Sequence, residues 1–140
     1  MTLAGDRLQR LGRLGIFAGL AESELRDLAA ELDERSFPEG HWVLRRGSAG
    51  VGLFIIVDGE VGVVVNDDEV ATLATGSFFG EVSVLLDEPA TADIVVRRPL
   101  RCLVIPPERA EAFLLAHPMV MFRMLQAEAR RLRTADPERA

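Results

Sequence analysis

The chain has 140 residues, 49% of them hydrophobic and 27% charged, a composition typical of a folded globular protein that excludes a disordered chain. Its net charge of −6 argues against a nucleic-acid-binding protein, because such proteins usually carry a basic patch. The basic residues are all arginine, a bias that fits a GC-rich bacterial genome.

The N-terminal segment and the single cysteine indicate a cytoplasmic protein. Arg7, Arg10 and Arg13 interrupt the apolar residues near the N-terminus, so no signal peptide is predicted, and no apolar run is long enough to cross a bilayer. Cys102 has no second cysteine with which to pair. It precedes the apolar run Leu103–Ile105, which predicts a buried structural thiol rather than a reactive one. We therefore expect no disulfide and no membrane partner.

In chain order, the sequence begins with helical patterns and changes to strand patterns near residue 38. Apolar residues at helical spacing predict a helical segment within residues 1–16 and a second helix between Glu22 and Glu34. The turn signal Pro38–Gly40 follows, and His41–Arg45 is predicted to be a strand.

The middle of the chain predicts two strand pairs. Leu53–Val57 is a continuous apolar run rich in β-branched residues, typical of a buried strand. Asp58–Gly59 is a strong hairpin signal, so Val61–Val65 is predicted to run back beside that strand. Thr91–Val96 and Leu100–Ile105 are expected to form a further pair across a turn at Arg97–Pro99.

The remaining patterns complete the set of elements. Asn66–Asp68 predicts a turn and Val70–Leu73 another short strand. Pro106–Pro107 is expected to end the sheet, and helices are predicted over Glu108–Ala116 and over about Met119–Arg133.

These elements predict a mainly β fold with flanking helices. We expect an antiparallel β-roll or jelly-roll barrel at about residues 36–105, with N-terminal helices before it and two C-terminal helices at about 107–133. The predicted division is an N-terminal helical segment at 1–16, one domain at 17–133 and a flexible tail at 134–140.

The segment from Phe78 to Ala92 combines a glycine, a carboxylate and a short helical pattern. Gly80 permits a positive φ angle or a close backbone approach. Glu81–Leu86 can form one or two helical turns, whose first N–H groups lack an internal partner and can face an anion. Since Glu81 places a carboxylate beside those donors, the segment suits a ligand that carries an anionic group next to a hydroxyl group. A ribose with a cyclic phosphate is such a ligand.

The same stretch resembles the phosphate-binding cassette of the cyclic-nucleotide-binding domain family, which includes catabolite activator proteins and regulatory subunits of cyclic-AMP-dependent kinase. The family pattern is roughly F-G-E, two or three small or apolar residues, and then P-R-[ATS]-A. The run Leu53–Val61, with Gly40 and Gly47 before it, is similar to the family's glycine-punctuated hairpin, and the resemblance extends from about Phe17 to Arg133. It implies the family's β-roll, a cAMP or cGMP ligand, and a regulatory domain without catalytic activity or cofactor.

The resemblance also implies roles for individual residues. Gly80 and Glu81 are expected to meet the ribose, with the Glu81 carboxylate accepting a hydrogen bond from the 2′-hydroxyl. The backbone N–H groups of Val82 and Ser83 are expected to face the phosphate. The two C-terminal helices are expected to repack over the occupied pocket and so pass a conformational change to a partner.

The second half of the segment departs from the family pattern at one position. Ala90 stands where the phosphate-pairing arginine is expected, and a hydrogen bond to a charged group contributes roughly 1.5–3 kcal/mol, or about one to two orders of magnitude in affinity. Thr91 is expected to touch the phosphate or a guanine base, and the N–H of Ala92 to reach the phosphate. Four arginines are candidates for supplying the missing charge: Arg45, Arg46, Arg97 and Arg98.

Ala90 also supports the main alternative, a ligand-independent interaction or dimerisation module with a degenerate pocket. A small β-barrel enzyme or metal protein is disfavoured, because His41 and His117 lie far apart without clustered ligands and Ser83 lies in no nucleophile motif. We therefore predict no metal site and no catalytic residues.

The last helix has two open interpretations. Its apolar residues between Met119 and Leu132 are expected either to pack on the roll or to form a homodimer seam, and an unknown protein partner is the alternative to a homodimer. Arg130, Arg131 and Arg133 are interpreted as complementing the negative C-terminal end of the helix dipole.

Overall fold

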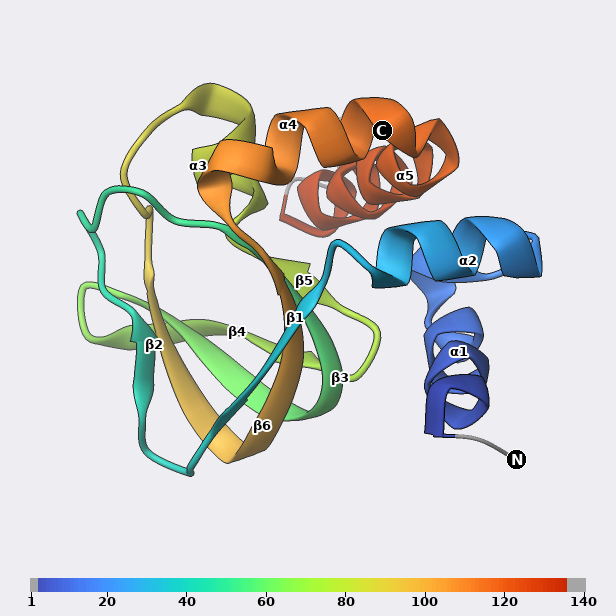
Figure 1. Cartoon of the computed structure of the whole chain (residues 1–140). Coiled ribbons are helices and arrows are strands. Elements are labelled where there is room, and N and C mark those ends of the chain that lie inside the picture. Colours follow the sequence, from blue (N-terminus) through green and yellow to red (C-terminus); the bar gives the residue numbers. More distant parts are fainter. Residues whose placement is uncertain (1–2, 136–140) are drawn as a thin grey trace.

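The structure is a computed structural model that describes residues 3–135, with side chains described from residue 8 onward. One antiparallel sheet curls into a roll, and the helices gather along the upper and right-hand sides of it in Figure 1. The helices are α1 (Leu3–Arg13), the 3-10 turn η1 (Gly15–Phe17), α2 (Glu22–Ala29), α3 (Glu81–Leu86), α4 (Pro107–Ala116) and α5 (Pro118–Ala135). The strands are β1 (Asp33–Phe37), β2 (Trp42–Leu44), β3 (Leu53–Val65), β4 (Asp68–Ala74), β5 (Phe78–Phe79) and β6 (Asp93–Ile105).

The sheet has the strand order β1-β6-β3-β4, with β2 paired to β6 and β5 paired to β3. All of these pairs are antiparallel. The predicted fold class, mainly antiparallel β with flanking helices, is confirmed. Because the strand order described for residues 3–135 has two ends, the sheet is an open roll and not a closed barrel.

The two hairpins predicted at Asp58–Gly59 and Arg97–Pro99 are wrong. Each of these segments lies inside a long strand, β3 or β6, and the two 13-residue strands pair with each other over their length. The pairing shifts register where the interruptions meet, with Asp58 opposite Arg101 and Glu60 opposite Arg98. The turn signals therefore mark bulges that bend the two central strands into a roll.

Gly59 shows why this bend needs glycine. Its φ is +104°, a conformation that other residues rarely adopt, and a Cβ at this position would overlap the carbonyl oxygen of Pro99 on the facing strand. The tight turn predicted at 66–68 does connect two strands, and Asn66 and Asp67 both have positive φ there.

The helix predicted between Glu22 and Glu34 is shorter in the structure than in the sequence pattern. Helix α2 ends at Ala29, and β1 begins at Asp33, inside the segment predicted to be helical. The strand is selected by its pairing with β6, from Asp33 opposite Val104 to Phe37 opposite Leu100. Helix α5 extends to Ala135, two residues into the predicted tail; residues 136–140 lie outside the described residues.

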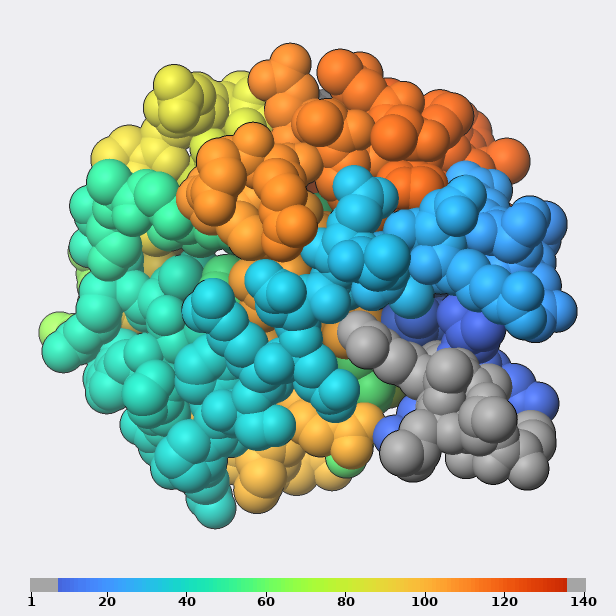
Figure 2. All heavy atoms as spheres, viewed as in Figure 1, coloured from blue at the N-terminus to red at the C-terminus, as the bar shows by residue number. Residues whose placement is uncertain are grey.

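The core has two parts that meet at the central strands. One part joins the helices to the outer face of the sheet and includes Phe17, Leu28, Ile55 and Phe113, all with no exposed surface. Figure 2 shows the blue residues of α2 packed directly below the orange residues of α4 and α5. The other part fills the roll and contains Ile56, Val61, Val96 and Cys102 together with Ala90. The roll and the helices are therefore one packed unit.

Candidate functional site

Helix α3 is positioned by the short strand that precedes it. Phe79 pairs with Phe54 of β3, and their rings stack with centroids 4.8 Å apart. Gly80 follows with a φ of +87°, which turns the chain from β5 into α3, and a Cβ there would overlap the carbonyl oxygen of Gly52. Only glycine allows this turn so close to the backbone of residues 51–52.

A pocket of about 200 Å³ opens between α3, the roll and α5. All seven residues that the sequence analysis assigned to the site line it: Gly80, Glu81, Val82, Ser83, Ala90, Thr91 and Ala92. The other lining residues are mainly apolar and come from the strands and α5: Leu44, Val63, Ala71, Leu73, Phe79, Ile94 and Arg131. The structure thus gathers the seven predicted site residues, from the two ends of the segment, around one concave surface, while the role of each residue toward a ligand stays a prediction.

Glu81 is the buried carboxyl group of this pocket, with 6% of its surface exposed. The pKa of Glu81 is raised from 4.5 to about 7, chiefly by burial and in addition by a side-chain hydrogen bond with Glu128 and the charge of Glu128. A hydrogen bond from its own backbone N–H and the charge of Arg131 act in the opposite direction. A buried carboxyl group with a raised pKa takes up a proton more readily than an exposed one, and in its ionised form it can accept a hydrogen bond from a ligand hydroxyl.

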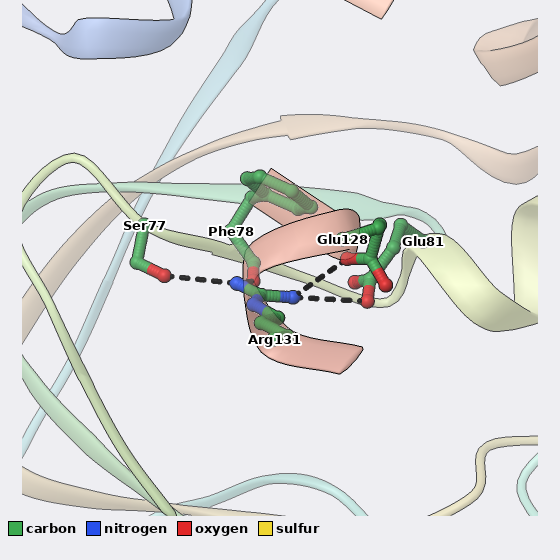
Figure 3. A network of polar contacts seen from close by, with 5 residues as sticks. All are labelled: Ser77, Phe78, Glu81, Glu128 and Arg131. Carbon is green, nitrogen blue, oxygen red and sulfur yellow. Dashed lines mark hydrogen bonds and ion pairs between the residues drawn. The ribbon is translucent and has the colours of Figure 1, made fainter. Parts of the chain in front are cut away.

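Arg131 is a site residue that the sequence analysis missed. It was interpreted together with Arg130 and Arg133 as complementing the helix dipole, yet its side chain points from α5 toward α3 and β5 (Figure 3). The ion pair between Arg131 Nη1 and Glu81 Oε1 measures 3.1 Å. In the sequence, Glu128 was the signal that could have indicated this role. It lies three residues before Arg131 and therefore on the same face of the helix, where the two side chains form an ion pair.

Among residues 3–135, no guanidinium lies at the Ala90 end of the pocket. Ala90 is 6% exposed, and its backbone is tied to the loop beside it, with its N–H donating to Ser48 and its carbonyl accepting from Gly47. None of the four arginines proposed as substitutes lines the pocket. Each interacts elsewhere: Arg45 with the Trp42 ring, Arg46 with Asn66, Arg97 with Glu69 and Arg98 with Glu60. The residues present therefore suit a ligand hydroxyl at Glu81 better than they suit a phosphate at Ala90.

His117 and Cys102 both lie in structural surroundings. His117 is buried where α4 meets α5, with its Nε2 atom 2.9 Å from Glu31 and its Nδ1 atom 3.5 Å from Glu24. Burial raises the pKa of the Cys102 thiol to about 12, which disfavours a reactive thiolate.

Within residues 3–135, no group of three or more His, Cys, Asp or Glu side chains is arranged to hold a metal ion. No described helix combines the length and apolarity needed to span a membrane.

Two sequence relatives share most of the chain. It is 30% identical over 116 residues to a cGMP-dependent protein kinase of Plasmodium berghei, a match that covers 83% of the chain and 14% of the kinase. It is 27% identical over 131 residues to a CRP-like cAMP-activated global transcriptional regulator of Mycobacterium tuberculosis, a match that covers 90% of the chain and 58% of the regulator. The chain therefore spans only part of the length of these relatives.

A solved structure and a family profile agree with these relatives. The Thermus thermophilus catabolite activator protein superposes with a TM-score of 0.76 at 28% identity, over 88% of this chain and 60% of that one. Residues 34–117 match the profile of the cyclic nucleotide-binding domain, which is a regulatory and non-catalytic unit. That match covers more than half of the chain and includes the predicted cassette and both central strands. The chain belongs to the cyclic nucleotide-binding domain family.

Proposed function

We propose that the domain senses a cyclic nucleotide, cAMP or cGMP, which enters the pocket between α3 and α5. The observation that carries the proposal is that all seven residues of the predicted cassette line this one pocket. Gly80 and Glu81 would meet the ribose. The backbone N–H groups of Val82, Ser83 and Ala92 would face the phosphate, with the Thr91 hydroxyl beside them.

Affinity is expected to be weak, because Ala90 offers the phosphate no charge partner. Hydrogen bonds to a charged group contribute roughly 1.5–3 kcal/mol each, so a missing guanidinium lowers affinity by about one to two orders of magnitude. The positively charged group on the pocket wall, Arg131, is engaged by Glu81 and Glu128. Relatives named for cAMP or cGMP support the ligand class, and the pocket of this chain supports a reduced affinity.

The signal would leave through α5, the helix that closes one side of the pocket. Val120 and Met124 hold its first half on the core, and Met119, Phe122 and Leu125 on the opposite face are exposed to between 47% and 64%. An exposed apolar helix face is suited to a second copy of the domain or to another protein partner. A cytoplasmic regulator whose partner reads the position of α5 is the function that these features favour.

The alternative function is a ligand-independent interaction or dimerisation module. Two observations favour it: the buried Ala90 at the phosphate end, and the ion pair that already engages Glu81 at the ribose end. It predicts that cyclic nucleotides do not change the stability of the protein.

Isothermal titration of cAMP and cGMP into the wild type, Ala90→Arg and Glu88→Arg tests the proposal. Glu88→Arg is the matched control, because it adds an arginine at an exposed position that lies outside the pocket lining. We expect weak binding to the wild type, binding that is about tenfold to a hundredfold tighter for Ala90→Arg, and wild-type behaviour for the control. Glu81→Ala should abolish the wild-type binding. Absence of binding to the wild type and to a folded Ala90→Arg protein at millimolar ligand would contradict the proposal.

A further inference from the structure

A second cavity, of about 320 Å³, lies between α1, the bulged parts of β3 and β6, and the turn that follows β4. Three arginines line it: Arg10 and Arg13 from the last turn of α1, and Arg101 from β6. The chain as a whole carries a net charge of −6, so three guanidinium groups around one small cavity form a local positive region. None of the residues described as lining this cavity also lines the pocket between α3 and α5.

Helix α1 holds two of these guanidinium groups at the edge of the cavity. Leu11 and Leu14, exposed by 2% and 5%, anchor the helix in the core. Arg10 and Arg13 are three residues apart and therefore lie on one side of the helix. Among the residues whose side chains are described, neither guanidinium forms an ion pair or a hydrogen bond. Both would complement the negative end of the α1 dipole, but that role does not explain why Arg101 of β6 lines the same cavity.

Arg101 reaches the cavity from the point where the central strands are irregular. The bulged pairing places it opposite Asp58 of β3. Its Nε atom lies 3.2 Å from Oε1 of Glu34, yet this nitrogen has no exposed surface and no hydrogen-bond partner within residues 3–135. Buried donors are normally paired, so the guanidinium of Arg101 has unused capacity for an acceptor.

The chemistry of the lining favours a tetrahedral anion. Guanidinium donors come from both α1 and β6, and the exposed Thr75 adds a hydroxyl from the turn after β4. That turn is held against β3 by the hydrogen bond from the Gly76 N–H to the Ile56 carbonyl oxygen, 2.9 Å long. A planar carboxylate is satisfied by the fork of one arginine, whereas donors from several directions match the oxygens of a phosphate.

We propose that this cavity is an anion site for the phosphate group of a small molecule, either phosphate itself or a phosphate monoester. Its volume lies at the lower end of the range for ligand pockets, and Leu14 and Val57 give it an apolar wall that suits the carbon atoms of a monoester. A bound phosphate would link α1 to β6. The site is independent of the proposed function, because the two cavities are lined by different residues.

Asp58 offers the opposing interpretation, in which a carboxylate of the chain itself neutralises the arginines. It lines the cavity, but no ion pair joins it to a guanidinium within residues 3–135. Together with Glu34 it leaves one of the three positive charges in excess. The two interpretations predict opposite effects of Asp58→Asn: phosphate binds more tightly if Asp58 only repels the anion, and not if Asp58 holds the arginines in place.

A titration with inorganic phosphate at constant ionic strength, followed by amide NMR, tests the site. The proteins are the wild type, Arg13→Gln and the control Arg26→Gln, which removes the same charge from an exposed ion pair on α2. We expect wild-type shifts at residues 10–14, 57–58, 75 and 101, at least about tenfold weaker binding in Arg13→Gln, and wild-type binding in the control. Absence of these shifts at millimolar phosphate, equal binding in Arg13→Gln, or shifts confined to Gly80–Ser83 would overturn the proposal.

Three further arms define the ligand. Asp58→Asn should bind phosphate about twofold to fivefold more tightly than the wild type, and unchanged or weaker binding would overturn the proposal in favour of an internal counter-ion. Acetate should bind the wild type about tenfold more weakly than phosphate, and equal binding would contradict a site for a tetrahedral anion. Glycerol 3-phosphate distinguishes the two sources: tighter binding than phosphate identifies a monoester, and equal binding identifies the phosphate ion.

Discussion

The buried carboxyl group of Glu81 gives the domain a pH-dependent stability that Glu81→Gln should remove. Its pKa is raised from 4.5 to about 7, first by burial and then by the hydrogen bond and charge of Glu128, against the effect of Arg131. A carboxyl group with a raised pKa in the folded state stabilises the fold while it is protonated. This contribution is fully present below about pH 4.5 and is lost as the pH rises through about 7. At about 1.4 kcal/mol per pKa unit, the loss is roughly 3 kcal/mol in the free energy of unfolding.

The assay is urea unfolding of the wild type, Glu81→Gln and Glu88→Gln at a series of pH values from 4.5 to 8.5. Because glutamine cannot ionise, Glu81→Gln should gain stability relative to the wild type as the pH rises, by up to about 3 kcal/mol at the alkaline end. Glu88 is exposed, so the profile of Glu88→Gln should parallel that of the wild type. A constant difference between Glu81→Gln and the wild type across this range would refute the reasoning.

Three further predictions concern the scaffold of the site. Gly80→Ala should destabilise the domain by on the order of 3 kcal/mol or more, since the new Cβ overlaps the Gly52 carbonyl oxygen. The control is Gly76→Ala, where φ is similarly positive but the space around the new Cβ is open, so the loss should be only about 1–2 kcal/mol. Equal losses of unfolding free energy would contradict this explanation. Phe113→Ala should cost about 3–5 kcal/mol by denaturant unfolding, because the ring has no exposed surface; a loss below 1 kcal/mol would be inconsistent with its place in the core. The Cys102 thiol should resist a thiol reagent at pH 8 until denaturant is added, and rapid modification of the native protein would contradict its burial and its raised pKa.

The fold class and the site segment followed from the sequence because both depend on local patterns. Runs of β-branched residues predicted the strands, and the resemblance of the segment to the phosphate-binding cassette predicted which of its residues share a pocket. The course of the two long strands, β3 and β6, could not be predicted from the sequence. Asp58–Gly59 is compatible with a hairpin and with a bulge, and the choice is made by Pro99 and Arg101 on a strand some forty residues away. A local pattern cannot contain that information.

Arg131 was missed for a related reason. A basic residue near the end of a helix normally complements the helix dipole, and Arg130 and Arg133 offer the same pattern on either side of it. The role of Arg131 depends on the rotation of α5 relative to α3, which is set by the packing of Val120 and Met124 against the core. The sequence could not place the four candidate arginines either, and the structure leaves them outside the pocket lining, with partners at Trp42, Asn66, Glu69 and Glu60.

An NMR titration of the wild type with cAMP and cGMP tests the central claim most directly, since it detects weak binding and locates it. The account predicts amide shifts confined mainly to Gly80–Ser83, to Thr91–Ala92 and to the end of α5 beyond Ala127. Shifts centred on another part of the surface, or none at millimolar ligand, would contradict the claim that the pocket between α3 and α5 is the ligand site of this domain.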